Sequence, residues 1–279
     1  MCELFAMSSR TPSTVNYSLH EFSRHGGLIH DNKSGWGIAY FSDQDAFIIR
    51  EPLPASDSPW VDFVASQHLE SRYVIAHVRR ASRGEPALRN THPFRRALGG
   101  RTHVFAHNGN LLGIHEIAAV RNLKRQPVGE TDSELAFCLL LQRLDAVWDQ
   151  PDVIPPLEAR MDLFTNFCSE MTALGPANFL YADSDTLFVH GDRRVYEENG
   201  GFSEPRAPGL SMRHRDSCAQ RPKWACDGLT VRHQDKRAVV FASVPLEEHG
   251  WEALPEGTAI ASQNGVEMLR RSTLEAGRA

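Results

Sequence analysis

The sequence predicts an α+β fold, in which a group of strands is followed by a group of helices and then by further strands. Three observations support this prediction. Short runs rich in β-branched and aromatic residues, separated by Gly and Pro, fill the chain up to residue 107. Longer segments with helical periodicity follow up to residue 173, and short β-rich runs return at residue 178. Because no repeat or low-complexity linker divides the chain, we expect residues 1–279 to form a single domain.

The first group of strands is expected where apolar runs are too short for helices. One helix is expected among them, over Ser58–Leu69, because Ser58 suits the N-cap and Pro59 suits the first turn. The expected strands are Leu4–Met7, Trp36–Phe41, Ala46–Arg50, Tyr73–Arg79 and His103–His107.

The helical part of the chain is expected over Gly113–Leu123, Thr131–Val147 and Leu157–Ala173. The second of these opens with T-D-S-E, a capping box in which the Thr131 hydroxyl and the Glu134 carboxylate satisfy backbone N–H groups of the first turn. The strands expected after the helices are Asn178–Ala182, Thr186–His190 and Ala238–Val244.

The stretch from residue 197 to residue 235 has poor periodicity and is rich in Gly, Pro, Arg and His. We therefore expect a long loop or an extended hairpin there. Its basic residues suggest a docking surface or a lid over a functional site, whereas a solvated loop is the simpler interpretation. These residues are Arg206, Arg213, Arg215, Arg221 and Lys223.

The composition is that of an ordinary globular protein. Of the 279 residues, 41% are hydrophobic and 23% are charged, which suffices for a normal core without disulfide or metal staples. The formal net charge of −5 argues against binding to the phosphate backbone of nucleic acid. The N-terminus lacks the basic and apolar regions of a signal peptide, and no apolar run reaches membrane-spanning length. We expect a cytoplasmic protein with no nucleic-acid or membrane partner.

The cysteines favour reduced thiols over disulfides or a metal site. The chain has five of them at irregular spacing, and no C-x-x-C pair occurs. Cys138 and Cys168 lie in apolar helical segments, where we expect inert core thiols. Cys218 and Cys226, together with His214, match no common zinc spacing. The sequence therefore predicts neither a metal nor a cofactor.

The remaining cysteine, Cys2 in the stretch MCELFAM, allows two interpretations. The stretch alternates well enough to be a strand with a buried thiol, and cysteine is among the most buried residue types. If Met1 is removed, however, Cys2 carries both a thiol nucleophile and a free α-amine that can act as its base. An isolated cysteine does not decide between a core thiol and a catalytic one.

Three other stretches contain residues suited to chemistry, each with a simpler structural explanation. Arg79, at a strand end, is suited to binding a carboxylate through two parallel hydrogen bonds, although arginines at such positions are often merely solvated. Asn108 and Gly109 can aim an amide and a backbone N–H at one point, as an oxyanion hole requires. Asn-Gly is also the commonest tight-turn dipeptide. Asp132, in the first turn of its helix, can receive a substrate ammonium or merely interact with the helix dipole.

Taken together and in order, these residues resemble the class II glutamine amidotransferases, whose glutaminase domains are N-terminal-nucleophile hydrolases. The stretches GWGIAYF, RGE and VGETDSE are most similar to the stand-alone YafJ-like branch. The resemblance covers at least Cys2–Cys138, extends more loosely to FASVPLEE, and implies the four-layer αββα sandwich of that superfamily. The ordered motifs are Cys2, R-x-A-S at Arg79–Ser82, N-x-H-P at Asn90–Pro93, H-N-G at His107–Gly109 and E-T-D-S-E at Glu130–Glu134.

The resemblance implies a role for each matching residue. The Cys2 thiolate would attack the side-chain amide of glutamine, and its α-amine would take the thiol proton and return it to the leaving ammonia. The Asn108 amide and the Gly109 N–H would stabilise the oxyanion, and water would hydrolyse the γ-glutamyl thioester. Arg79 would bind the α-carboxylate of the substrate and Asp132 its α-ammonium.

Supporting roles are implied for three more residues, and two features depart from the family. Ser82 adds a hydrogen bond to the substrate, His107 supports Asn108 rather than transferring protons, and His92 is structural. Arg80 stands where the synthases of this class often have an aromatic residue. No acceptor domain is recognisable after the glutaminase domain, so an unidentified ammonia-accepting protein is a candidate partner, and a homo-oligomer is left open.

Two alternatives to a glutamine amidotransferase stay open. The protein can instead hydrolyse another γ-glutamyl amide, with Arg79 and Asp132 holding the glutamyl end and a larger leaving group in the pocket. It can also be a catalytically inactive module that binds an amino acid or a partner. Relative turnover of glutamine and γ-glutamyl amides tests the first alternative, and thioester formation tests the second.

Overall fold

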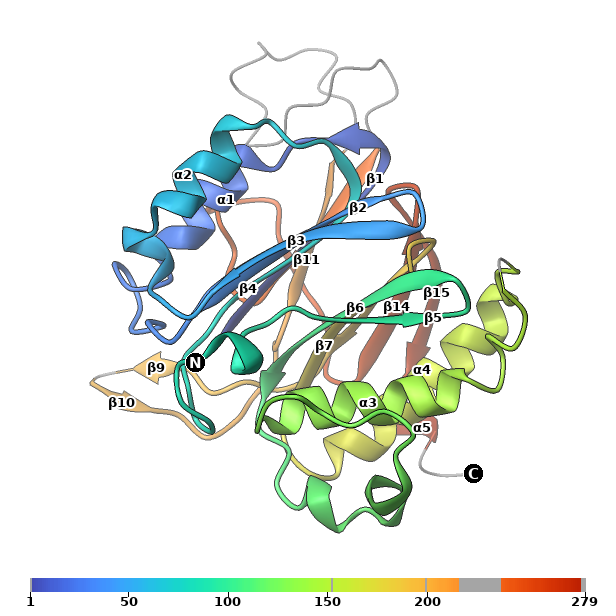
Figure 1. The fold of residues 1–279 in the computed structure, drawn as a ribbon. Coiled ribbons are helices and arrows are strands. Elements are labelled where there is room, and N and C mark those ends of the chain that lie inside the picture. Colours follow the sequence, from blue (N-terminus) through green and yellow to red (C-terminus); the bar gives the residue numbers. More distant parts are fainter. Residues whose placement is uncertain (1, 152, 199, 216–236, 277–279) are drawn as a thin grey trace.

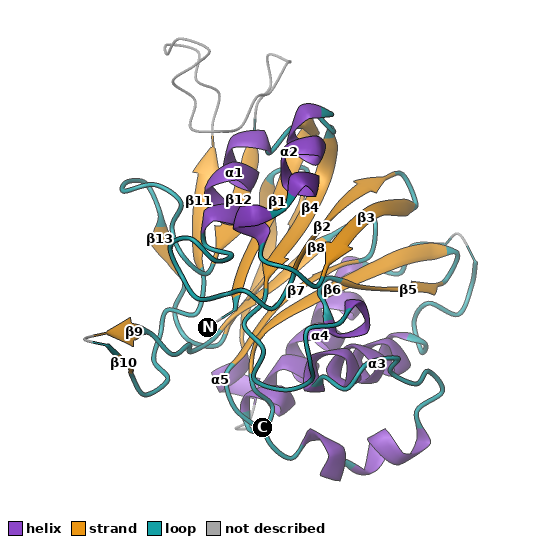
Figure 2. Ribbon diagram, turned by 60° about the vertical axis from the view of Figure 1, so that its left-hand side comes forward, coloured by secondary structure: helices purple, strands orange, loops and turns teal. Residues whose placement is uncertain are grey.

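Two antiparallel sheets packed face to face form the centre of the molecule, and helices cover the outer face of each (Figure 1). The computed structural model describes residues 2–151, 153–198, 200–215 and 237–276. Figure 2 shows the layers after a rotation, with one pair of helices above the first sheet and another pair below the second. This order of layers confirms the predicted αββα sandwich.

The first sheet has seven strands in the order β13-β11-β12-β1-β4-β2-β3. Its central strand β1 pairs with β4 on one side and with β12 on the other, and both pairings are antiparallel. Segments far apart in the sequence are therefore needed to complete this sheet. The strands are β1 (Glu3–Ser13), β2 (Trp36–Ser42), β3 (Asp45–Glu51), β4 (Ser71–Val78), β11 (Ser211–Arg215), β12 (Ala238–Ala242) and β13 (Glu252–Ala253).

The second sheet has six strands in the order β15-β14-β8-β7-β6-β5. A separate two-stranded hairpin is formed by β9 (Glu197–Glu198) and β10 (Gly201–Phe202). The strands of the second sheet are β5 (Phe94–Leu98), β6 (Arg101–Gly109), β7 (Ala177–Ala182), β8 (Leu187–Gly191), β14 (Thr258–Gln263) and β15 (Val266–Ser272).

The helices form the outer layers. Helices α1 (Asn16–Arg24) and α2 (Pro59–Ser66) cover the first sheet, whereas α3 (Asp132–Leu144) and α4 (Leu157–Thr172) cover the second (Figure 1). The shorter helical segments are α5 (Thr273–Ala276) and the 3₁₀ turns η1 (Ala55–Asp57), η2 (Leu88–Asn90), η3 (Ile114–Glu116) and η4 (Ala118–Asn122).

Alternation of side chains along the strands divides the core into three layers. On β1, Leu4 and Ala6 pack between the two sheets, whereas Phe5 packs against the helices α1 and α2. On β6, Ala106 likewise faces the space between the sheets, and Phe105 faces α3 and α4. Even-numbered residues at these two strand ends therefore face the same inner layer, and this relation positions the site.

The predicted N-caps at Ser58 and Thr131 are confirmed, although the capping box at Thr131 is incomplete. The Ser58 hydroxyl accepts a hydrogen bond from the N–H of Trp60 at the start of α2. The Thr131 hydroxyl accepts the N–H of Glu134 at 3.2 Å. The Glu134 carboxylate instead accepts the N–H of Gly129 at 2.6 Å, so it secures the segment before the helix.

The helix predicted over Gly113–Leu123 is wrong. This segment forms the two 3₁₀ turns η3 and η4, because Gly113 has a left-handed backbone with φ of 77° and Ile117 is extended between the turns. The strands and α-helices that the sequence did not predict are α1, α5, β5, β11, β13, β14 and β15.

The basic stretch expected as a loop or hairpin contains the β9–β10 hairpin and, in addition, the sheet strand β11. Arg213 and Arg215 on β11 form ion pairs with Glu247, and Arg206 pairs with Glu198. The other expected basic residues and the two late cysteines lie outside the described residues: Arg221, Lys223, Cys218 and Cys226. Over the described ranges, the helices are too short or too polar to cross a membrane.

Candidate active site

Cys2 lies directly before β1, at the edge of the first sheet where β1 begins and β4 ends. The register pairs Glu3 with Val78, so Cys2 comes beside Arg79. The backbone of Arg80 holds the thiol: its N–H donates to Sγ at 3.2 Å, and its carbonyl accepts the S–H at 3.2 Å. By alternation with Leu4, the thiol faces the layer between the sheets.

The surroundings of Cys2 keep its thiol protonated at neutral pH. Burial raises the pKa of the Cys2 thiol, and this effect outweighs the hydrogen bond from the Arg80 backbone. The charge of Arg79 lowers that pKa and the charge of Asp132 raises it. Both predicted charged residues therefore lie within electrostatic reach of the sulfur, and the thiol needs a base to become a nucleophile.

The Arg79 guanidinium is buried and enclosed by backbone carbonyls. Nη1 donates to the carbonyls of Ser34 and Glu85, at 3.3 and 3.2 Å. Nη2 donates to the carbonyls of Arg83 and Gly84, at 2.6 and 3.1 Å. These four bonds occupy the Nη N–H groups, so Arg79 holds the turn at residues 83–85 beside Cys2.

Asn108, at the end of β6, connects to β1 through Ser243. Its Nδ2 donates to the Ser243 hydroxyl at 3.3 Å, and the same hydroxyl accepts the N–H of Leu4 at 3.1 Å. The N–H of Ser243 in turn donates to the Leu4 carbonyl at 2.9 Å. Sequence reasoning missed Ser243, although it lies in the FASVPLEE stretch that carries the looser part of the resemblance.

Gly109 is required by a close approach of two strands. A Cβ at this position would lie 1.7 Å from the Pro176 carbonyl oxygen and 2.6 Å from Nε2 of His107. The residues Asn108 and Gly109 form no turn, because β6 continues through both and pairs with β7. Glycine thus permits the strand end to approach β7 closely.

Asp132 and His107 are both buried and both engaged with the backbone. The Asp132 carboxylate, in the first turn of α3, accepts the N–H groups of Leu111 and Ser133 at 2.7 and 2.9 Å. Burial lowers the pKa of His107, whose Nε2 donates to the Pro176 carbonyl at 3.2 Å. Its Nδ1 accepts the Ser133 hydroxyl at 2.9 Å. Both ring nitrogens of a neutral His107 are therefore occupied by structural contacts.

The segments that carry the other motifs contact one another. The Asn90 side chain accepts the N–H of Glu130 at 2.9 Å and donates to the Glu85 carbonyl at 3.2 Å. His92 is buried and stacks on His77, with 4.2 Å between ring centroids. Burial lowers the pKa of His77 to about 3 and that of His92 well below its ordinary value, so both rings are neutral.

Arg80 links three parts of the rim around Cys2. Its guanidinium lies 3.6 Å from Asp31 and 3.6 Å from Glu197, and it stacks over the Phe202 ring at 4.9 Å from the centroid. The departure from the family at this position thus attaches the β9–β10 hairpin to the rim. Ser82 is exposed on the next loop, and its side chain has no hydrogen-bond partner within the described ranges.

One group of metal-ligating side chains occurs among the described residues, and it lies on the other face of β1. It consists of Glu3, His25 and His30. Burial would raise the pKa of Glu3, but hydrogen bonds from the two histidines outweigh it and lower the pKa to about 2.

Comparison with known proteins agrees with this geometry. The family model of class II glutamine amidotransferases matches residues 1–277. YafJ of Escherichia coli (strain K12) is 37% identical over 190 residues, which make up 68% of this chain and 72% of YafJ. The crystal structure of a predicted glutamine amidotransferase from Pseudomonas aeruginosa has a TM-score of 0.67 at 27% identity, and the match covers 96% of this chain and all of that one.

A more distant structure shares the fold alone. The glutamine phosphoribosylpyrophosphate amidotransferase of B. subtilis has a TM-score of 0.62 at 16% identity, over 98% of this chain and 49% of that chain. The match therefore reaches one half of a larger protein and nearly all of the chain described here. By sequence along almost its whole length, and by fold, this chain belongs to the class II glutamine amidotransferases.

Proposed function

We propose that this protein hydrolyses the side-chain amide of glutamine to glutamate and ammonia, with Cys2 as the nucleophile. The observation that carries the proposal is the position of the Cys2 thiol within reach of one buried cation, Arg79, and one buried carboxylate, Asp132. Free glutamine has one α-carboxylate and one α-ammonium, which are the complementary charges. Membership of the class II amidotransferases supports the same substrate.

Acylation requires a base close to the thiol. Burial raises the pKa of Cys2, so the thiol is not ionised by its surroundings. Removal of Met1 frees the α-amine of Cys2, whose ordinary pKa of about 7.7–8.0 suits proton transfer in both directions near neutral pH. The amine takes the thiol proton, and the thiolate then attacks the side-chain carbonyl carbon of glutamine.

The negative charge that develops on the carbonyl oxygen is met by two donors at the end of β6. The Asn108 amide has two N–H groups, one of which Ser243 holds, and the other is left for the oxyanion. The backbone N–H of Gly109 is the second donor. When the C–N bond breaks, the α-ammonium of Cys2 returns its proton to the leaving nitrogen, and ammonia departs. Water then attacks the γ-glutamyl thioester, giving glutamate and restoring the thiol.

Arg79 and Asp132 bind the charged groups of the substrate in different ways: Arg79 exchanges hydrogen-bond partners, and Asp132 adds one. Arg79 now donates to neutral carbonyls, whereas a carboxylate carries the opposite charge and accepts two parallel N–H bonds from a guanidinium, so substrate binding exchanges carbonyls of residues 83–85 for the α-carboxylate. Asp132 uses one lone pair on each oxygen for backbone N–H groups. Its other lone pairs are left for the α-ammonium.

The proposal is tested by the intact mass of the purified full-length protein, before and after a glutamine-like diazoketone. We expect loss of Met1 and one adduct at Cys2, blocked by excess glutamine and abolished in Cys2→Ala, together with ammonia release from glutamine. Cys138→Ala, which removes a buried thiol from α3, is the matched control and keeps the adduct. A chain that has lost Met1 but shows neither the adduct nor ammonia release overturns the proposal. Faster turnover of another γ-glutamyl amide would make that amide, and not glutamine, the substrate.

A further inference from the structure

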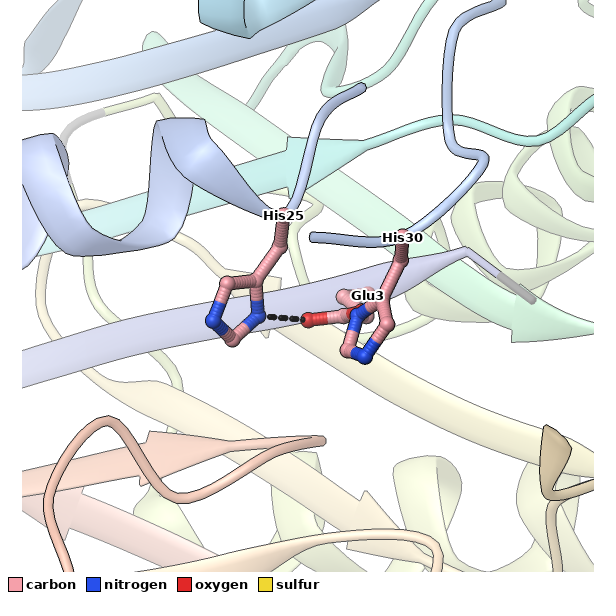
Figure 3. A group of neighbouring side chains, drawn as sticks. All are labelled: Glu3, His25 and His30. Carbon is pink, nitrogen blue, oxygen red and sulfur yellow. Dashed lines mark hydrogen bonds and ion pairs between the residues drawn. The ribbon is translucent and has the colours of Figure 1, made fainter. Parts of the chain in front are cut away.

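Glu3, the first residue of β1, follows Cys2, but its side chain points to the opposite face of the strand. There it lies between two histidines from the segment that follows α1 (Figure 3). The Nδ1 atoms of His25 and His30 each lie 2.6 Å from one of the two Glu3 carboxylate oxygens. One ligand atom from each of the three residues lies within 4.8 Å of the others.

We propose that Glu3, His25 and His30 bind one divalent transition-metal ion such as Zn²⁺, with Asn32 as a fourth ligand. Two imidazole nitrogens and one carboxylate are a donor set that suits zinc and its neighbours in the first transition row. The sequence predicted no metal, and the only residues weighed as zinc ligands were Cys218, Cys226 and His214.

The burial of Glu3 and His25 is consistent with a bound ion. Glu3 is 3% exposed and His25 is 7% exposed, so the ligand atoms are shielded from competing water. The side chain of His30 is 34% exposed and gives the ion a path of entry. A charged carboxylate in such surroundings is favoured when a cation neutralises it.

Asn32 gives independent support for an ion at this cluster. This residue is fully buried, and its Nδ2 lies 3.1 Å from a Glu3 oxygen. Its Oδ1 is buried and has no hydrogen-bond partner among the described residues. A half-turn about the Cβ–Cγ bond interchanges the two amide atoms. It places the amide oxygen beside Glu3, where this oxygen can ligate the same ion in place of the hydrogen bond to the carboxylate.

Entry of the ion needs only a small movement. Zinc–nitrogen and zinc–oxygen bonds of about 2.0–2.2 Å place tetrahedral ligands about 3.3 Å apart, so each imidazole nitrogen moves away from the carboxylate by about 0.7 Å. His25 caps the end of α1, and His30 lies in the turn closed by a bridge between Gly26 and Asp31. This turn is at the surface and outside both sheets, so it can move without disturbing strand pairing.

The same segment reaches the rim of the active site. The N–H of Ser34 donates to the Arg79 carbonyl at 2.9 Å, and the Ser34 hydroxyl accepts the N–H of Ala81 at 3.0 Å. Asp31 pairs with Arg80. An ion at Glu3 therefore fastens this segment to β1 beside the nucleophile, and its role is structural. The binding of the ion stands on geometry alone, and only its effect on turnover rests on the proposed function.

The test uses the full-length protein, stripped with EDTA, dialysed and titrated with ZnCl₂ by calorimetry. Metal analysis gives the stoichiometry, and CoCl₂ gives a visible ligand-field spectrum. We expect one ion per chain, a higher Tm with zinc, and a Kd raised at least 10-fold in both His25→Ala and His30→Ala. His115→Ala removes an exposed histidine from η3 and is the matched control, with an unchanged Kd.

A stoichiometry of zero, or an unchanged Kd in both ligand variants, overturns the site and leaves a hydrogen-bonded Glu–His cluster. Far-UV circular dichroism checks the fold of each variant, and the partly exposed His30 provides the test if His25→Ala does not fold. Zinc binding in a protein that releases no ammonia from glutamine would sink the proposed function and keep the metal site. Ammonia release without zinc binding would overturn the metal site and keep the proposed function.

Discussion

The side-chain amide of Asn108 donates a hydrogen bond to the Ser243 hydroxyl, with 3.3 Å between Nδ2 and Oγ. The two residues come from different sheets: Asn108 lies next to the last residue of β6 in the second sheet, and Ser243 follows β12 in the first. The same hydroxyl accepts the N–H of Leu4, close to Cys2. One hydroxyl therefore sets the position of the proposed oxyanion donor relative to the nucleophile strand.

Replacing Ser243 by alanine tests this connection. The Asn108 amide loses the group that orients it, so we expect kcat to fall about 10- to 100-fold while KM changes little. Leu4 also loses an acceptor, which costs about 1–3 kcal/mol of unfolding free energy. Steady-state kinetics with glutamine and urea unfolding measure the two effects. Ser262→Ala removes a buried hydroxyl bonded to Val266 and is the control, with a stability loss but normal kcat.

Gly109→Ala is expected to disrupt the site. Its Cβ would meet the Pro176 carbonyl oxygen at 1.7 Å, so the strand end must shift, and we expect a stability loss above about 2 kcal/mol with little remaining activity. Gly201→Ala provides the comparison, because a Cβ there lies 3.8 Å from the nearest atom, the Glu198 carbonyl oxygen. Equal Tm values for the two variants would show that β6 and β7 do not approach as described.

Asp132→Asn tests the proposed ammonium clamp. The amide oxygen can still accept the Leu111 N–H, but the negative charge is lost, so we expect KM for glutamine to rise about 10-fold or more. A glutamine analogue that lacks the α-amine serves as the second substrate. The preference for glutamine over this analogue should shrink in the variant, and an unchanged preference would contradict the role. Asp149→Asn, at an exposed position, is the control.

Acid should destabilise the protein through its buried histidines. Burial lowers the pKa of His103 to about 4 and that of His190 to about 4. In the unfolded chain each takes up a proton near its ordinary pKa of about 6.5, so the folded state loses stability as pH falls from there toward 4. Each contributes a loss of about 2 kcal/mol between pH 7 and pH 5. Urea unfolding at the two pH values measures it, and His190→Gln should reduce the difference by one histidine's share.

The predictability of the fold depended on how strongly each segment is patterned. β2 and β4 were predicted nearly in full, because they are continuous apolar runs buried on both faces. Helix α1 was missed because its sequence NYSLHEFSR is mostly polar, and it buries only a few apolar side chains such as Leu19 and Phe22. Such a helix is stabilised by packing on the sheet, which local pattern does not reveal.

The dipeptide Asn-Gly shows the limit of local signals. At Asn264 and Gly265 both residues have positive φ, 52° and 74°, and they form the hairpin turn between β14 and β15. That hairpin was not predicted from the sequence. At Asn108 and Gly109 the same pair continues a strand, because β7 pairs alongside it. Only tertiary contacts distinguish the two cases.

The motif residues of the site were identified from their order along the chain, but their hydrogen-bond partners were not. That Arg79 is enclosed by carbonyls of its own following loop depends on the turn at residues 83–85. The contact of Ser243 with Leu4 joins residues 239 positions apart, and no spacing rule connects them. Long-range pairing of this kind is a property of the folded sheet.

The pairing of β1 with β12 also determines the order of events during synthesis. Residues 3–8 leave the ribosome first, but one edge of their strand has no partner until residues 238–242 have been made. A chain that ends before residue 238 therefore lacks the second partner strand of β1, and its first sheet stays incomplete beside Cys2. Under the proposed function, removal of Met1 while the chain is being made would expose the α-amine of Cys2 before the first sheet is complete.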